Sequence, residues 1–193
     1  MENKENGKTY SATRFCRDEI QKHNYILITN IKSLSKNIKG SIYNNNLLDI
    51  IELVTNQEGE NKYIIFFDEI FTALEKNGSL RSDVLSFLSQ LRKRQILLVT
   101  TAQEWLEINI TLRRYCRFVV DCDMKTIPFT KKAICINIIK DGDLLHWDQI
   151  ENDYVAPVIQ TNIFKGNEEI INIYDTFETI DTSKVLLNKS RQH

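Results

Sequence analysis

The sequence predicts an α/β fold in which helices flank a mainly parallel sheet, followed by an antiparallel β extension. Residues 63–67 (Y-I-I-F-F) and 96–99 (I-L-L-V) are short runs that are apolar throughout, which is typical of strands buried on both faces of a parallel sheet. Between them, residues 82–91 place Val84, Leu85, Leu88 and Leu91 on one helical face. Apolar strands that alternate with helical segments indicate a parallel sheet.

The other elements follow from their local patterns along the 193-residue chain. We expect a helix that starts at Gly7, a helix at 47–55, strands at 25–30 and 118–120, and a helix or loop at 105–117. Residues 33–46 are rich in Lys, Ser and Asn and predict a surface loop. Residues 133–139 read as an antiparallel strand, and Asp141-Gly142 predicts a hairpin turn after it. We therefore expect a core at residues 1–130 and a β-rich extension at 131–193, packed on the same domain.

Two adjacent acids, Asp68 and Glu69, follow the apolar strand at residues 63–67. Open α/β sheets bind their ligands at the carboxyl ends of the strands. In P-loop nucleoside triphosphatases such a strand presents an Asp to Mg²⁺ and a Glu to the attacking water. The alternative is a buried strand followed by a solvated Asp-Glu turn. These residues alone leave both interpretations open.

An upstream Gly7-Lys8-Thr9 favours the phosphate-binding interpretation. A Gly-Lys-Thr that opens a helix is the second half of the P-loop motif, in which backbone N–H groups hold phosphate oxygens. The Lys reaches the β- and γ-phosphates, and the Thr hydroxyl binds Mg²⁺. We assign Gly7, Lys8, Thr9 and Tyr10 to nucleotide binding, and Thr9 and Asp68 to the metal. The alternative is an ordinary helix start with a Thr near its cap.

The first half of this motif is missing. The full pattern has another Gly at the start of the loop, where this chain has Glu2, and residues 1–6 (M-E-N-K-E-N) contain no apolar strand. A strand precedes the phosphate loop in βαβ nucleotide sites. We expect that the chain either begins late or has lost the front of its loop. ATP binding by this chain alone is therefore an open question.

Polar groups also follow the strand at residues 96–100. Thr101 and Gln103 come next, and a Gln or Thr at that place can hydrogen-bond the γ-phosphate or orient the attacking water. Arg113 and Arg114, further along, could reach the nucleotide of a neighbouring subunit. The alternatives are a strand end followed by a helix start, and surface arginines on a helix.

Composition narrows the class of protein. A net charge of −1 provides no overall basic field for nucleic-acid binding. No apolar run approaches the ~20 residues that span a bilayer, so we expect no membrane segment in this chain. The 4 cysteines form no C-x-x-C pair and predict reduced thiols in a cytoplasmic protein.

The order of these motifs resembles that of the zonular-occludens-toxin-like ATPases, which are relatives of the FtsK/HerA DNA-pumping ATPases and occur in filamentous phages and mobile elements. The matching segments are Gly-Lys-Thr with its helix, I-L-I-T-N-I, Y-I-I-F-F-D-E, L-R-K-R, and I-L-L-V-T-T-A-Q before L-R-R, within residues 7–123. The resemblance implies a RecA-like P-loop NTPase sheet of the class that has an additional strand and a catalytic Glu. The chain departs from the family in its missing first strand and first loop Gly.

The resemblance also implies roles for individual residues. Lys8 and Thr9 would serve the phosphates and Mg²⁺, Asp68 would hold Mg²⁺ through water, Glu69 would activate water, Gln103 would sense the γ-phosphate, and Arg113 or Arg114 would act in trans. ATP hydrolysis would drive DNA packaging, DNA transfer or filamentous virion assembly, usually from a homo-oligomeric ring. Assembly-type phage members often carry a membrane segment, and its absence here favours a packaging or mobile-element relative.

We therefore expect an ATP- and Mg²⁺-dependent motor domain, with DNA or phage and element assembly proteins as candidate partners. It would be cytoplasmic, or peripheral at the inner membrane of a phage or element host. The alternative is a non-catalytic P-loop-like module that has kept the sheet and lost nucleotide binding. A small-molecule nucleoside kinase is less favoured, because the sequence has no Arg-rich lid.

Overall fold

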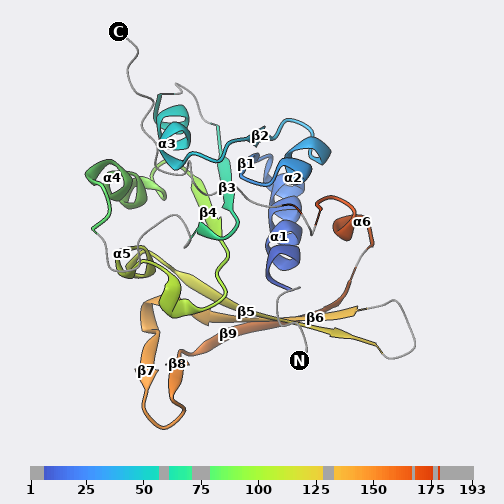
Figure 1. The fold of residues 1–193 in the computed structure, drawn as a ribbon, viewed down its shortest axis with the longest axis vertical. Helices are drawn as coiled ribbons and strands as arrows, with labels where there is room; N and C mark the ends of the chain where they lie inside the picture. Colours follow the sequence, from blue (N-terminus) through green and yellow to red (C-terminus); the bar gives the residue numbers. More distant parts are fainter. Residues whose placement is uncertain are drawn as a thin grey trace.

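The computed structural model describes residues 7–56, 61–70, 79–127, 133–166, 168–175 and 178. The helices are α1 (Lys8–His23), α2 (Lys32–Asn37), α3 (Leu47–Asn56), α4 (Ser82–Gln90), α5 (Ile110–Arg114) and α6 (Glu168–Ile171), with 3-10 turns η3 (Trp105–Glu107) and η4 (Gly142–Leu144). The strands are β1 (Ile26–Thr29), β2 (Ile42–Tyr43), β3 (Tyr63–Phe67), β4 (Ile96–Thr100), β5 (Phe118–Thr126), β6 (Ala133–Asp141), β7 (His146–Asp148), β8 (Asp153–Val155) and β9 (Val158–Lys165). Figure 1 shows their arrangement.

The central sheet has the strand order β2-β1-β3-β4, and every pairing in it is parallel. Ile26 pairs with Tyr63, and Tyr63 pairs in turn with Ile96, so β1, β3 and β4 run in step. Every residue of β3 is buried, because the strand has a neighbour on each side and side chains packed on both faces. The predicted α/β class with a mainly parallel sheet is confirmed.

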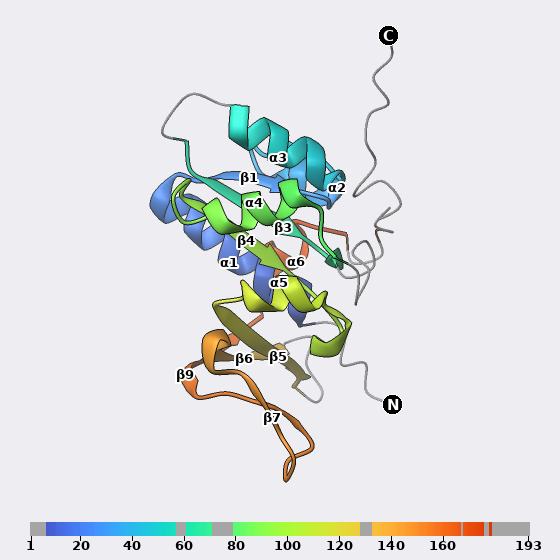
Figure 2. The same ribbon diagram turned by 90° about the vertical axis from the view of Figure 1, so that its left-hand side faces the viewer.

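Helices cover both faces of this sheet: α3 and α4 lie on one side of its strands and α1, α2 and α6 on the other (Figure 1), and Figure 2 looks onto the side that carries α4. Tyr63, Ile65 and Phe67 of β3 pack into one core with the apolar faces of α3 and α4. Ile64 and Phe66 pack into a second core with α1, α2 and α6. Successive residues of a strand point to opposite faces, so one uninterrupted apolar run serves both cores.

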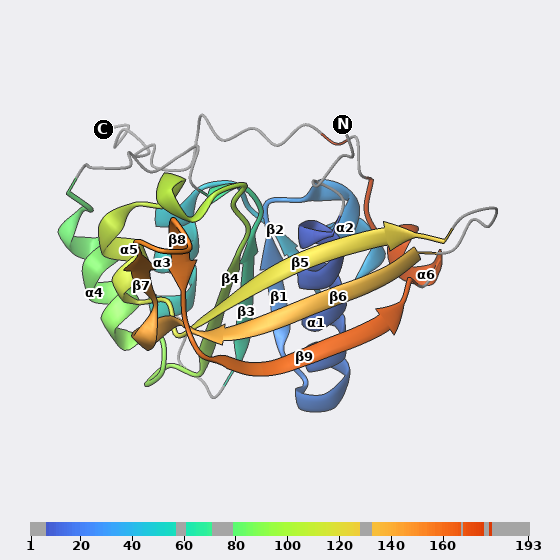
Figure 3. The same ribbon diagram turned by 90° about the horizontal axis from the view of Figure 1, so that it is seen from below.

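The second sheet is antiparallel, with the order β5-β6-β9, and it packs on the start of α1 (Figure 3). Each of its strands contacts the helix. Gly7 lies against Cys122 and Met124 of β5, the Ser11 hydroxyl donates to Asn137 of β6 at 2.8 Å, and Tyr10 stacks on Phe164 of β9. The predicted antiparallel segment is confirmed. The strand expected at 118–120, before that segment, extends over Phe118–Thr126 and pairs with β6 in the same sheet.

Two sequence predictions of local structure were wrong. Residues 33–46 were expected to form a surface loop, yet they contain most of α2 and all of β2. Leu34 is fully buried and fixes α2 against the second core, while Ile42 pairs with Ile28 and adds β2 to the sheet edge. Tertiary contacts therefore order a stretch whose polar composition favours a loop.

The predicted Asp141-Gly142 hairpin turn is also absent. Asp141 ends β6 and is followed by η4, while β6 pairs with β5 and β9. Gly142 is needed for a close approach instead: an added Cβ would lie 2.2 Å from the Cys116 carbonyl oxygen, and the Gly142 N–H donates to the Arg117 carbonyl at 2.9 Å. The projecting hairpin visible in Figure 1 is formed by β7 and β8.

Candidate functional site

The Asp68 carboxylate lies at the centre of the candidate site. Asp68 follows β3 at its carboxyl end and is 7% exposed. The Thr9 hydroxyl donates to its two oxygens at 3.1 and 3.2 Å, and the Thr101 hydroxyl donates to Oδ1. Helix α1 and the end of β4 therefore meet at one carboxylate.

Thr9 is positioned by the first turn of α1. Gly7 is the N-cap of this helix, and its cap carries no side-chain hydrogen bond. The Thr9 hydroxyl points to Asp68 across 59 residues of sequence. The first N–H groups of a helix lack partners within the helix, and its positive dipole end favours anions. The start of α1, with Lys8 and Thr9, thus lies beside the carboxyl end of β3.

Glu69 has an unusual backbone conformation. Its φ is +55°, in the left-handed region that non-glycine residues seldom occupy. The peptide group between Asp68 and Glu69 is hydrogen-bonded at both ends: its carbonyl accepts from the Asn30 side chain at 2.9 Å, and its N–H donates to Thr101 Oγ1 at 3.0 Å. Such conformations persist where the surroundings hold them, and they cluster at functional sites.

The electrostatics of the site follow from burial. Burial raises the pKa of Asp68 above its usual value, while the hydrogen bonds from Thr101 and Thr9 act in the opposite direction. The neighbouring Glu69 charge adds to the rise and the Lys8 charge opposes it. Lys8 and Glu69 therefore both lie within electrostatic reach of one carboxylate.

The predicted site residues divide into two groups. Lys8, Thr9, Asp68 and Glu69 are brought together around the end of β3. Gly7 begins α1 beside them, but the Tyr10 side chain is 1% exposed and belongs to the second core, so only its backbone could contact a ligand.

Gln103, Arg113 and Arg114 lie further along the chain. Gln103 is exposed in the turn after β4, and no contact places it on the acids in the part of the chain that the structure describes. The Arg113 guanidinium lies 5.9 Å from the centre of the Trp105 ring, whereas Arg114 is exposed at the end of α5.

Thr101 was expected, like Gln103, to face a γ-phosphate, whereas Asn30 was not predicted as a site residue. The Thr101 hydroxyl donates to the Asp68 carboxylate and accepts from the Glu69 N–H, so Thr101 contacts both residues. Asn30 is 2% exposed and holds both backbone groups of Asp68. The signal that identified Asp68, a polar residue directly after an apolar parallel strand, also applies to Asn30 after β1 and Thr101 after β4.

The donor set at Asp68 fits Mg²⁺ held together with a nucleotide. Within the described ranges, no group of three or more His, Cys, Asp and Glu side chains could hold a metal ion. Mg²⁺, however, is usually bound by one or two carboxylates, with waters and substrate phosphates completing its shell. The Thr9 hydroxyl and the Asp68 carboxylate are oxygen donors of the kind that Mg²⁺ prefers, and they are in direct contact.

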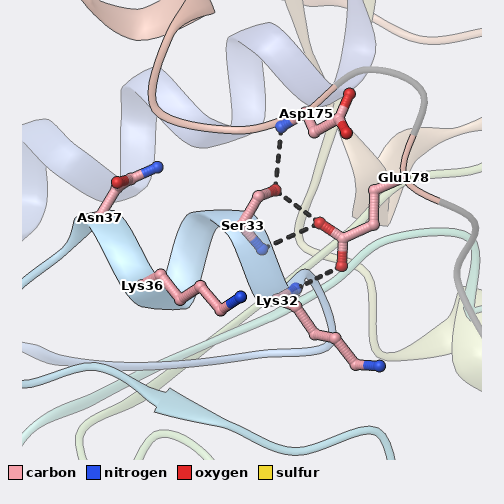
Figure 4. A pocket seen from close by; sticks show the side chains of 6 residues that line it. All are labelled: Lys32, Ser33, Lys36, Asn37, Asp175 and Glu178. Atoms are coloured by element: carbon pink, nitrogen blue, oxygen red, sulfur yellow. Dashed lines mark hydrogen bonds between the residues drawn. The ribbon is translucent and has the colours of Figure 1, made fainter.

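A separate pocket lies at the start of α2. It is lined by Lys32, Ser33, Lys36, Asn37, Asp175 and Glu178 (Figure 4). None of these residues belongs to the group around Asp68. The Glu178 carboxylate already accepts from the Lys32 and Ser33 backbone N–H groups at 2.6 and 2.9 Å. The Glu178 carboxylate in this pocket is therefore engaged by the chain itself.

Comparison with solved structures supports the same architecture. The N-terminal domain of zonular occludens toxin from Neisseria meningitidis superposes with a TM-score of 0.56 at 16% identity, and the match covers 87% of this chain and 92% of that one. The chain has the fold of that toxin domain. The resemblance in motif order to zonular-occludens-toxin-like P-loop ATPases is thus confirmed at the level of the fold.

A weaker similarity exists to a viral protein. The genome packaging NTPase B204 from Sulfolobus turreted icosahedral virus 2, solved in complex with ATP-gammaS, gives a TM-score of 0.47 at 10% identity, covering 77% of this chain and 89% of that one. No protein-family model matches the sequence, and no curated protein matches it. In the described ranges, no helix is both long enough and apolar enough to cross a bilayer.

Proposed function

We propose that the chain is a nucleoside-triphosphate-hydrolysing domain whose site lies at the carboxyl end of β3. The observation that carries the proposal is the contact between the Thr9 hydroxyl, in the first turn of α1, and the buried Asp68 carboxylate. A helix start that bears a lysine and a hydroxyl, opposite an acid at the end of a parallel strand, suits a phosphate chain with Mg²⁺. The fold shared with the toxin domain supports the same class.

Each residue then has a defined task. Lys8 neutralises charge on the β- and γ-phosphates, and Thr9 with Asp68 holds the metal, which supplies positive charge to the phosphate oxygens. Glu69 accepts a proton from the attacking water. Thr101 donates to the Asp68 carboxylate and accepts from the Glu69 N–H, so it holds the end of β3 in place, and Gln103, two residues further on, would contact the γ-phosphate.

Arg114 suits the trans role better than Arg113. Arg113 packs over Trp105 of its own chain, while the exposed Arg114 is free to approach a neighbouring subunit. We propose a homo-oligomeric ring on this ground and on the family resemblance. The work driven by hydrolysis would be DNA packaging, DNA transfer or filamentous virion assembly. The 4 free cysteines support a cytoplasmic setting.

Replacement of Glu69 by Gln tests the proposal. The Glu69→Gln variant should bind Mg-ATP like the wild type and hydrolyse it about 10³-fold more slowly, because a general base contributes roughly 10²–10⁴. Steady-state phosphate release and equilibrium binding of labelled ATP measure the two quantities. Glu52→Gln, on the exposed side of α3, is the matched control and should keep wild-type turnover.

The alternative is a non-catalytic module that uses the same sheet without nucleotide. It is favoured by the incomplete loop motif, where Glu2 replaces the first Gly. Residues 1–6, which include this position, lie outside the described residues. Wild-type turnover in Glu69→Gln would remove Glu69 from the mechanism. Absence of saturable ATP binding would favour the non-catalytic module.

A further inference from the structure

We propose that Asn30 is a positioning residue for hydrolysis, acting by fixing the peptide that carries Glu69. This inference rests on the proposed function and extends it to a residue that touches neither phosphate nor metal in that scheme. Asn30 follows β1, the neighbour of β3, and is 2% exposed.

The Asn30 side chain continues the hydrogen bonding between β1 and β3 beyond their last paired residues. The last paired residues of β1 and β3 are Thr29 and Phe66, two positions before Asp68. Beyond them, Asn30 Oδ1 accepts from the Asp68 N–H and Nδ2 donates to the Asp68 carbonyl, both at 2.9 Å. A carboxamide carries one acceptor and one donor group, as a backbone peptide does, so it can continue the pairing with β3.

The bond to the Asp68 carbonyl is the one that bears on Glu69. That carbonyl and the Glu69 N–H belong to the same peptide group, and Thr101 accepts from the N–H at 3.0 Å. Side chains from the strands on either side of β3 thus clamp this peptide at both ends. These two hydrogen bonds fix the orientation of the peptide group that precedes the Glu69 Cα. Because the Glu69 backbone continues from this group at φ +55°, they also set the direction of its carboxylate.

The amide is chemically required for this task. An Asp at the position would offer only acceptors, and would face the Asp68 carbonyl with a negative charge. A Leu of similar shape would leave both backbone groups of Asp68 unpaired in a buried place. Either change should let the peptide group between Asp68 and Glu69 rotate. Thr9, Lys8 and the Asp68 carboxylate should keep their positions for binding the metal and the phosphates.

A double-mutant cycle on the full chain tests the inference. Asn30→Leu should lower kcat for ATP about 100-fold, the scale of a misplacement near 1 Å, and leave the affinity for Mg-ATP unchanged. In a Glu69→Gln background the same change should cause no further loss, because Asn30 acts through Glu69. If Asn30→Leu fails to fold, Asn30→Asp, which keeps one of the two hydrogen bonds, replaces it in the cycle.

Asn46→Leu is the matched control. Asn46 is 7% exposed and its Oδ1 accepts from the Leu48 N–H at the start of α3, so this change removes a buried amide elsewhere. It should lower the melting temperature without lowering kcat. Equal losses from Asn30→Leu in both backgrounds, or an equal loss from Asn46→Leu, would overturn the inference and assign Asn30 a general structural role.

The outcomes also separate this inference from the proposed function. If Glu69→Gln slows hydrolysis about 10³-fold while Asn30→Leu turns over normally, only the role of Asn30 is wrong. If Glu69→Gln hydrolyses ATP at the wild-type rate, or the wild type hydrolyses none, the proposed function fails and this inference fails with it.

Discussion

Asp68 is a buried carboxylate whose hydrogen-bond partners are neutral. Among the described residues, no lysine or arginine forms an ion pair with it, and two hydroxyl groups, those of Thr9 and Thr101, donate to it. A buried acid without a cation is unfavourable, because burial penalises its charged form. Burial raises the pKa of Asp68, as expected when the charged form is penalised. Such a residue fits a site that is completed by a bound cation, and contributes little to the stability of the empty fold.

Gly7 allows the site and the fold to be tested separately. Its φ of −96° is open to any residue, and an added Cβ would meet neighbours only at 3.6 Å, an ordinary contact distance. Gly7→Ala should therefore change the free energy of unfolding by less than about 0.5 kcal/mol. If the Gly7 backbone approaches a phosphate, the same change should weaken ATP binding about tenfold or more, which is ~1.4 kcal/mol.

Urea denaturation and equilibrium binding of labelled ATP measure the two effects of Gly7→Ala. Loss of stability in step with loss of binding would make Gly7 a structural residue. Unchanged binding would place the phosphates away from this helix start.

Among single residues, those that belong to a spaced motif could be predicted from the sequence. Thr9 and Asp68 belong to spaced motifs, and they do meet. Asn30 follows an apolar strand as Asp68 does, but its contacts are to the backbone of Asp68, so no spaced motif distinguishes it from other polar residues at strand ends. Thr101 and Gln103 were both candidates, and only burial at the end of β4 distinguishes them.

Among the elements, α2 depends most on distant parts of the chain. Its start is held by Glu178, whose carboxylate accepts from two backbone N–H groups and from the Ser33 hydroxyl (Figure 4). Asn37 at its other end donates to the Ile173 carbonyl at 2.8 Å. An acid at a helix start satisfies unpaired N–H groups and is favoured by the helix dipole.

Glu178→Gln tests this capping contact. Burial raises the pKa of Glu178, but the hydrogen bonds from Ser33 and Lys32 outweigh it and bring the pKa below the usual 4.5. A lowered pKa stabilises the fold above pH 4.5, and this stabilisation is lost as the pH falls through the lowered value. Glu178→Gln should lower the free energy of unfolding by about 1 kcal/mol at pH 7 and have little effect in acid.

Urea denaturation at several pH values measures the Glu178→Gln effect, with the exposed Glu52→Gln as control. A difference from the wild type that does not shrink in acid would contradict the assignment of the effect to the Glu178 charge.

The strands of the central sheet were predictable, whereas α2 was not. An uninterrupted apolar run such as β3 has few alternatives to a buried strand. The six residues of α2 include one apolar residue, Leu34, and α2 is stabilised by contacts with residues 136–146 positions further along the chain. The composition of residues 33–46 does not indicate these distant partners. The loop prediction was therefore wrong because tertiary contacts, and not local sequence, stabilise α2.

For the whole molecule, α1 is the element that joins its parts. One side of this helix packs on the parallel sheet, and its start packs on all three strands of the antiparallel sheet (Figure 3). The phosphate-binding end proposed for α1 therefore lies where the two sheets approach each other. Tyr174, after α6, is buried in the second core together with Tyr10 of α1, and burial and the Asp68 charge raise its pKa to about 12.

The candidate site is assembled from segments that are far apart in the sequence. Thr9, Asn30, Asp68 and Thr101 come from four successive parts of the chain, and the parallel sheet aligns three of them at one edge. That this sheet is parallel could be predicted from alternating strands and helices. The packing of the antiparallel sheet on α1 could not, because the contacts of Ser11 and Tyr10 with that sheet have no sequence signature.

Equilibrium binding of labelled ATP to the full chain, with and without Mg²⁺, tests whether α1 and the end of β3 form a nucleotide site. We expect saturable, Mg²⁺-dependent binding that is lost in Lys8→Ala and kept in Lys22→Ala, a matched change at the far end of the same helix. Binding that does not saturate, or that survives in Lys8→Ala, would contradict a nucleotide site between α1 and the end of β3.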